Sequence, residues 1–288
     1  MQRLRPNRLE GATPIPNLQK PPMPSITSPQ NPRVKNAVRL RSRRHREKQG
    51  RILIDGTREL HRAIDAGVKL IETFVCESLC ENDDAKHLLA TLDSSGGEVL
   101  HVSESVFEKL AFGQRAEGIL GVAEMPRPTL ETIAPAENSL ICVLEGVEKP
   151  GNFGAVLRSA DAAGVSAVLM ADARTDLYNP NAIRASLGTI FTVPVCEATS
   201  GDVLGWLRKN GFHIFTARVD GAVPYTEINY CRRAAIVLGN EATGLSSTWA
   251  GDDITAVSLP MLGVADSLNV SVTAAVLFYE ALRQRMAD

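Results

Sequence analysis

Two short turns in the last third of the chain hold the residue types that a ligand site needs. Residues 239–246 form a polar stretch rich in glycine, and they follow an apolar run, 234–238, which we expect to be a buried strand. Residues 260–271 also include small and polar residues, and they follow a second expected strand, 254–259. Such turns allow backbone groups to approach a ligand closely. Two ordinary strand-to-helix turns are the alternative interpretation.

Three ordered motifs in the second half of the chain resemble those of the SpoU (TrmH) branch of the SPOUT RNA methyltransferases. The first is Asn-x-Gly-apolar-apolar-x-Arg, which is present as Asn-Phe-Gly-Ala-Val-Leu-Arg at 152–158. The second is Gly-Asn-Glu at 239–241, followed by Gly-Leu at 244–245. The third combines Leu-Pro-Met at 259–261 with Ser-Leu-Asn-Val-Ser at 267–271. The resemblance covers residues 140–285 strongly and the preceding part more weakly.

This resemblance implies a fold and a cofactor. The fold is a parallel α/β sheet whose C-terminal segment is threaded through an earlier loop, as a trefoil knot, which is an exception to the usual absence of knots. The cofactor is S-adenosylmethionine, held in a bent form by the knot loops and largely by their backbone groups. The matched positions and their neighbours are Leu238, Gly239, Leu259, Met261, Ser267 and Leu268. For the leucines, plain core packing is the alternative.

The resemblance also implies a reaction, which is methyl transfer to a ribose 2′-oxygen of structured ribosomal or transfer RNA. Because the sulfonium methyl is already electrophilic, the protein must add in-line positioning and help with the hydroxyl proton. The matched catalytic residues are Arg158, Asn152, Glu241 and Asn269. A guanidinium keeps its proton up to a pKa above roughly 12, so we expect Arg158 to anchor the target phosphate rather than act as the base.

Several of these residues have a structural alternative. Asn152 precedes an expected helix at 153–163, and capping that helix could be its only role. Glu241 could order its loop, and Arg158 could be an ordinary exposed helix residue. The chain also departs from the Asp-Pro-x-Asn entry of many relatives, because Lys149 occupies the aspartate position and makes the local charge positive.

Other enzyme classes fit the sequence poorly. The glycine-bearing turn at 146–154 lacks the G-x-G-x-x-G pattern of a dinucleotide site, and the chain has no P-loop, no H-E-x-x-H and no nucleophile elbow. Two alternatives to ribose methylation stay open. One is an RNA-binding protein of the same fold without methyl transfer, and the other is a base methyltransferase, because a fold does not determine its chemistry.

Charge is distributed unevenly along the chain. The net charge of the 288 residues is −2, yet the first 51 residues hold 13 basic and only two acidic side chains. An arginine-rich segment suits phosphate binding, and a solvated helix face is the alternative. The expected RNA-binding residues are Arg39, Arg43, Arg44, Arg46 and, nearer the motifs, Arg184. 

Composition and periodicity suggest four segments. We expect a disordered proline-rich tail at 1–27, a basic helix from residue 28 with a small α/β RNA substrate-binding domain up to 124, a linker at 125–138, and the methyltransferase domain at 139–288. In the last domain we expect strands at 140–144, 167–170, 191–195 and 212–216. The closing helix, 270–285, is apolar almost all round, which predicts burial on two sides and a homodimer.

The expected compartment is the cytoplasm. No apolar run reaches transmembrane length, and the first residues lack the apolar core of a secretory signal. The five cysteines include no second pair beside Cys76 and Cys80, so we expect reduced thiols and no metal site.

Overall fold

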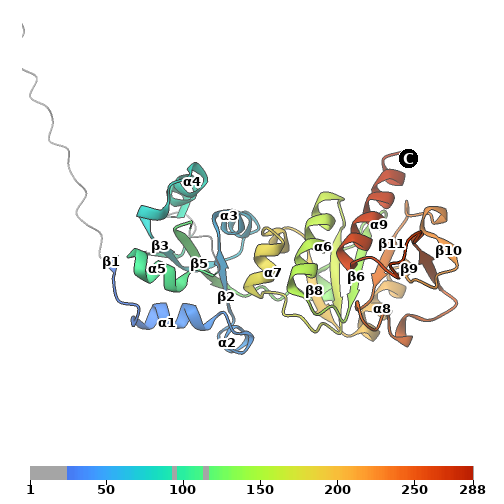
Figure 1. Cartoon of the computed structure of the whole chain (residues 1–288), viewed down its shortest axis with the longest axis horizontal. Coiled ribbons are helices and arrows are strands. Elements are labelled where there is room, and N and C mark those ends of the chain that lie inside the picture. Colours follow the sequence, from blue (N-terminus) through green and yellow to red (C-terminus); the bar gives the residue numbers. More distant parts are fainter. Residues whose placement is uncertain (1–24, 93–95, 113–116, 288) are drawn as a thin grey trace, which may run out of the picture.

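The computed structural model describes residues 25–92, 96–112 and 117–287, and it places them around two separate sheets (Figure 1). We call residues 25–124 the N-terminal body and residues 140–287 the C-terminal body. Residues 1–24, most of the expected tail, lie outside the described residues. Within the described ranges, no helix combines the length and the apolar character that a membrane crossing requires.

The N-terminal body contains a five-stranded mixed sheet in the order β1-β4-β3-β5-β2. Its elements are β1 (Ser25–Ile26), α1 (Pro32–Arg39), α2 (Arg43–Gln49), β2 (Arg51–Asp55), α3 (Thr57–Asp65), β3 (Leu70–Val75), α4 (Asp83–Leu92), β4 (Glu98–Val102), α5 (Glu104–Leu110) and β5 (Ile119–Glu124). β5 runs antiparallel to both β2 and β3, whereas β4 pairs in parallel with β1 and β3. Buried side chains of α1 and α5 share one cluster with the sheet, and those of α3 and α4 share another.

Two expectations for this part of the chain are wrong. The basic helix is divided in two, because α1 ends at Arg39 and α2 begins only at Arg43. It also starts later than Ser28: the Asn31 side chain caps α1 by accepting a bond from the Arg33 N–H at 2.9 Å. Residues 25–26, assigned to the tail, form strand β1 and pair with His101 and Val102.

The C-terminal body contains a seven-stranded sheet in the order β10-β12-β9-β11-β6-β7-β8, and every pairing in it is parallel. Its strands are β6 (Leu140–Glu145), β7 (Ala167–Ala171), β8 (Val195–Ala198), β9 (His213–Ala217), β10 (Val223–Pro224), β11 (Ala234–Leu238) and β12 (Ile254–Ser258). Its helices are α6 (Pro150–Ala162), α7 (Pro180–Ala185), α8 (Ser200–Lys209) and α9 (Val270–Arg285).

Both faces of this sheet are covered, as the alternation of strands and helices predicts. β6, β7 and β11 are buried along their whole length. Alternate side chains of β6 point to opposite faces: Leu144 belongs to the cluster of α6 and α9, and Val143 to that of α8. The expected strand at 191–195 is wrong. Residues 189–191 form a 3-10 turn in which the Thr189 hydroxyl bonds the Ser186 carbonyl at 2.9 Å, and β8 starts at Val195.

The two bodies meet at α7, which lies between α6 and the N-terminal body (Figure 1). Arg46 pairs with Asp176 across this junction, and the Arg62 guanidinium donates to the Leu187 carbonyl at 2.7 Å. Arg184 reaches back and lies 3.6 Å from the buried carboxylate of Asp55. These charge-assisted contacts fix how the N-terminal body sits beside the C-terminal body.

Candidate functional site

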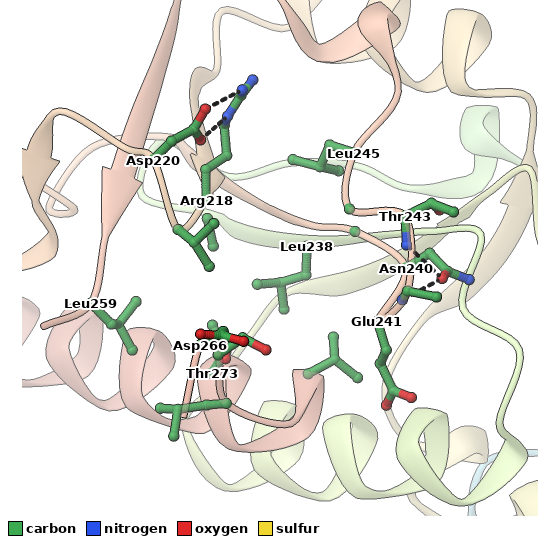
Figure 2. A pocket seen from close by; sticks show the side chains of 18 of the residues that line it. Arg218, Asp220, Leu238, Asn240, Glu241, Thr243, Leu245, Leu259, Asp266 and Thr273 are labelled. Atoms are coloured by element: carbon green, nitrogen blue, oxygen red, sulfur yellow. Dashed lines mark hydrogen bonds and ion pairs between the residues drawn. The ribbon is translucent and has the colours of Figure 1, made fainter. Parts of the chain in front are cut away.

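A pocket of about 470 Å³ opens at the carboxyl ends of β9, β11 and β12 (Figure 2). In open α/β sheets, this end of neighbouring parallel strands is where ligands bind. The lining residues come from the segments 217–220, 238–245, 259–268 and the start of α9. They include every residue expected to bind the cofactor: Leu238, Gly239, Leu259, Met261, Ser267 and Leu268.

The loop after β11 depends on a glycine and on an asparagine side chain. A Cβ on Gly239 would lie 2.4 Å from the carbonyl carbon of Gly244, so the loop closes against itself only with glycine there. Asn240 and Gly244 exchange backbone hydrogen bonds of 3.1 and 2.9 Å. The Asn240 side chain also accepts from the Ala242 N–H at 2.8 Å and donates to the Gly146 carbonyl at 2.8 Å. Backbone shape at this wall of the pocket is therefore set locally.

The polar residues of the three motifs form one hydrogen-bonded cluster. Glu241 accepts bonds from the Asn152 amide and, at 2.6 Å, from the Lys149 ammonium. The Asn269 amide donates to Asn152 Oδ1 at 3.3 Å and to Glu241 Oε1 at 3.5 Å. Because Glu241 also lines the pocket, this cluster lies at the pocket rim. The hydrogen bond that Lys149 donates to Glu241 raises the pKa of Lys149, so its charge persists beside the carboxylate.

The cluster corrects one alternative for Asn152. Helix α6 begins at Pro150 with Lys149 as its N-cap residue, so Asn152 lies inside the first turn and does not cap the helix. Its side chain is directed instead to Glu241 and Asn269. Asn269 itself is the cap of α9, since its Oδ1 accepts from the Ser271 N–H at 2.9 Å. Lys149, the departure from the usual entry, holds Glu241 in place.

Arg158 lies apart from the pocket of its own chain. It is exposed on α6 and is not among the residues that line the pocket. Six residues separate it from Asn152, which places the two side chains about 120° apart around the helix. The part of α6 one turn before Arg158 packs closely on α7, because a Cβ on Gly154 would lie 2.5 Å from the Ala185 Cβ. The single chain thus unites Asn152, Glu241 and Asn269, but not Arg158.

The expected RNA-binding arginines divide into two groups. Arg39, Arg43 and Arg44 are exposed on α1 and α2, where Arg43 pairs with Glu47 at 2.6 Å. Arg46 is only 1% exposed and bonds the Leu40 carbonyl and Asp176, so the expectation that it contacts RNA is wrong. The side chain of Arg184 is 23% exposed and lies 3.6 Å from Asp55 at the junction of the two bodies, and its contact with RNA stays a prediction.

Sequence reasoning missed several charged residues of the pocket. Arg218 and Asp220 line it directly after β9 and form a bidentate ion pair of 2.8 and 2.9 Å. Asp266 lines it from the loop before α9 (Figure 2). Arg218 and Asp220 follow directly after a strand of the parallel sheet, and this position in the sequence could have indicated that they line a ligand site. In the part of the chain that the structure describes, no three His, Cys, Asp or Glu side chains gather as metal ligands.

Comparisons with known proteins cover both bodies. Residues 139–279 match the SpoU rRNA Methylase family, and residues 31–121 match a domain described as an MRM3-like substrate binding domain. A crystal structure of an RNA 2′-O ribose methyltransferase shares 43% identity and a TM-score of 0.80, over 91% of this chain and 99% of that one. An AdoMet-bound rRNA methyltransferase from Sinorhizobium meliloti shares 28% identity and a TM-score of 0.82, over 90% and 97% of the two chains.

A relative found by comparison of sequences also matches most of the chain. The 23S rRNA (uridine(2479)-2'-O)-methyltransferase of Streptomyces viridochromogenes is 29% identical over 86% of this chain and 88% of its own length. The family match at residues 139–279 spans all the loops that form the pocket. The parallel α/β architecture expected from the motifs is confirmed by these structures. This chain belongs to the SpoU (TrmH) family of RNA methyltransferases.

Proposed function

We propose that the protein transfers the methyl group of S-adenosylmethionine to a ribose 2′-oxygen of ribosomal RNA. The observation that carries this proposal is the convergence of three motifs: apolar and glycine positions of the second and third motifs line one pocket, and polar side chains of all three are hydrogen-bonded at its rim. The named relatives support it, since two of them are named as RNA 2′-O-methyltransferases and the third is an AdoMet-bound rRNA methyltransferase.

The pocket fits this cofactor in shape and charge. Leu238, Leu259 and Leu268 give it apolar walls for a flat nucleoside, and the tight loop at Gly239 leaves backbone groups accessible. Its acidic side chains, which include Glu241 and Asp266, suit a cationic ligand. S-adenosylmethionine, when bound, supplies an electrophilic methyl carbon on a sulfonium. The protein therefore needs to place the sugar oxygen in line with that carbon.

The polar cluster and Arg158 have different roles in the reaction. We assign Asn152 and Asn269 to orientation of the ribose, and Glu241 to ordering the loop through Lys149 and Asn152. As the new C–O bond forms, the 2′-hydroxyl must release its proton. A guanidinium that is already protonated cannot accept it. We therefore assign Arg158 to binding the target phosphate, so that a phosphate oxygen can receive the proton.

A second subunit would bring Arg158 to the site. Helix α9 exposes Val272, Tyr279 and, just beyond its end, Met286, which are 47, 52 and 79% exposed and recur every seven residues. Such a stripe is typical of a helix face that packs on a partner. We propose a homodimer through this stripe, with Arg158 of one subunit serving the pocket of the other. The C-terminal trefoil knot in the domain at 139–288, implied by the family, is part of the same proposal.

The N-terminal body would recognise the RNA. Arg39 and Arg44 are exposed on neighbouring helices, and no ion pair involving either is found within the described residues. The rigid junction at α7 would hold this basic surface at a fixed separation from the pocket. We propose that residues 25–124 form the RNA-binding domain, 125–138 the linker and 139–288 the methyltransferase domain, and that the protein acts in the cytoplasm.

A methyl-transfer assay tests the proposal. Purified protein, S-adenosylmethionine and ribosomal RNA from a strain that lacks the gene should yield one new 2′-O-methylnucleoside, and transfer RNA from the same strain should yield less. Binding of RNA and cofactor without transfer would favour the RNA-binding alternative. Methyl groups on bases would favour the base methyltransferase.

A further inference from the structure

An ion pair that belongs to none of the three motifs lines the pocket. Arg218 Nε and Nη2 donate to the two carboxylate oxygens of Asp220 at 2.8 and 2.9 Å. In Figure 2 this pair and Glu241 lie on opposite sides of the pocket, with Leu238 between them. The pair therefore faces the end of the pocket away from the polar cluster.

The backbone around this pair is held firmly against β12. The Arg218 N–H donates to the Val257 carbonyl at 2.9 Å, and the Gly221 N–H closes a turn onto the Arg218 carbonyl at 3.3 Å. A Cβ on Gly221 would lie 2.5 Å from the carbonyl carbon of Val257, so this close approach requires glycine. The turn thus presents both charges at a fixed place before any ligand arrives.

The charges of the pocket define what this end can bind. Among the described residues that line it, Arg218 is the only cation, whereas Asp220, Glu241 and Asp266 are acidic. A ligand carboxylate in this pocket therefore has a single side chain with which to pair. Guanidinium groups bind carboxylates through two parallel hydrogen bonds, and that geometry is already in use between Arg218 and Asp220.

We infer that the Arg218–Asp220 pair binds the amino-acid end of S-adenosylmethionine, with Arg218 on the α-carboxylate and Asp220 on the α-ammonium. This inference rests on the proposed function. The amino-acid end is a zwitterion, so it can replace each partner of the pair with a group of like charge. No charge is left unpaired in the exchange. The pocket lining holds three acidic residues and one basic residue, so its net negative charge also suits the single net positive charge of the cofactor.

Calorimetric binding of two ligands to the full-length protein tests this inference. S-adenosylmethionine has the amino-acid end, whereas 5′-methylthioadenosine has the same nucleoside and lacks it. Arg218→Ala should weaken S-adenosylmethionine binding about 10-fold to 100-fold, the usual effect of losing hydrogen bonds to a charged group. Binding of 5′-methylthioadenosine should change by less than about 3-fold. Arg218→Lys keeps the positive charge but cannot form two parallel hydrogen bonds. Its affinity for S-adenosylmethionine should therefore lie between those of the wild type and Arg218→Ala.

Arg208→Ala is the matched control. Arg208 forms a similar, partly exposed bidentate pair with Asp253, at 2.7 and 2.8 Å, outside the pocket, and its loss should leave both affinities unchanged. Equal weakening of both ligands by Arg218→Ala would overturn the inference, because it would indicate a distorted pocket. Reduced methylation with unchanged cofactor affinity would also overturn it and assign Arg218 to RNA. Failure of the wild-type protein to bind S-adenosylmethionine would instead refute the proposed function.

Discussion

The Asn269 side chain donates a hydrogen bond to the Asn152 side chain over 3.3 Å, although 117 residues separate the two in sequence. Asn152 projects from the first turn of α6, and Asn269 caps α9, so two helices must be in place for the contact to form. Glu241 joins the same contact from the loop after β11. The polar rim of the pocket therefore exists only when three distant segments have folded together.

Substitutions of Asn269 should separate its two roles. Asn269→Asp keeps an oxygen that can cap α9 but removes the amide donor to Asn152 and Glu241. We expect its thermal midpoint to stay within a few degrees of the wild type while kcat falls at least about 10-fold, the effect of losing a positioning contact. Asn269→Ala should lose the cap as well, at a cost of about 1 kcal/mol in unfolding free energy. Unchanged kcat in Asn269→Asp would show that the cap is the only role.

Gly239→Ala should abolish cofactor binding without unfolding the chain. The added methyl would lie 2.4 Å from the carbonyl carbon of Gly244, and the clash has to open the loop that forms the pocket wall. Gly205→Ala is the control, because Gly205 lies in α8 with no atom near its Cβ position. That change should stabilise the protein by about 0.5–1 kcal/mol and leave binding unchanged. Cofactor binding by Gly239→Ala at wild-type affinity would contradict the loop geometry.

The junction between the bodies should make stability depend on pH. Burial raises the pKa of Asp55 to about 6, despite the hydrogen bond from the Phe112 N–H and the charge of Arg184, which lower it. The folded state thus holds a proton that the unfolded chain has released above about pH 4, so stability falls as pH rises from about 4 to about 6 and levels off above that.

Asp55→Asn removes this proton uptake and is the test. The difference in unfolding free energy, wild type minus Asp55→Asn, should decrease between pH 4.5 and 7.5 by about 2 kcal/mol at most. Urea unfolding at the two pH values measures it. Glu59, whose pKa burial also raises, remains in both proteins and cancels in the comparison. A difference that is constant or increases with pH would contradict the assignment to Asp55.

Mixed dimers test whether Arg158 serves the partner's pocket. Arg158→Ala and Gly239→Ala should each be inactive alone. If the site is shared between subunits, mixing the two after dissociation should restore about a quarter of wild-type activity, because half of the dimers are mixed and each contains one intact site. Arg158→Ala should keep its cofactor affinity. Absence of any restored activity, with mixed dimers verified by mass, would place Arg158 within its own subunit.

The proposed dimer should dissociate when a charged residue is introduced into its interface. Tyr279→Glu places a carboxylate in the middle of the exposed stripe on α9, where burial against a second copy would leave it unpaired. Light scattering at micromolar concentration should then report the monomer mass, and activity should fall with it. A monomeric wild type, or a dimeric Tyr279→Glu, would contradict the proposed interface.

Sequence patterns predicted the structure correctly where an apolar run in the sequence is also buried in the fold. The apolar runs of β6, β7 and β11 indicated buried parallel strands, and the order of motifs located the pocket-lining loops. Sequence patterns failed where a contact with a residue far away in the chain determines whether a side chain is buried. The burial of Arg46 depends on Asp176, 130 residues away, and nothing in the arginine-rich segment distinguishes it from Arg44. Helix α6 begins three residues before the expected start at 153, because Pro150 occupies its first position, where the fixed φ of proline favours a helix.

The ion pair of Arg218 and Asp220 shows a different limit. Its residues are close in sequence and follow an expected strand, yet only the folded chain shows that they share a pocket with residues 259–268. Pocket membership depends on the order of β9, β11 and β12 in the sheet. Strand order is not encoded in any local pattern, so residues outside a recognised motif escape sequence reasoning.

The central claim is that methyl transfer ends on a ribose oxygen, and alkaline hydrolysis of the product tests it most directly. A methylated 2′-oxygen cannot attack the neighbouring phosphate, so RNA labelled from methyl-tritiated S-adenosylmethionine should release its label in an alkali-resistant dinucleotide. The Asn269→Asp variant should release at least about 10-fold less in equal time. Label recovered in mononucleotides would place the methyl group on a base and contradict the account.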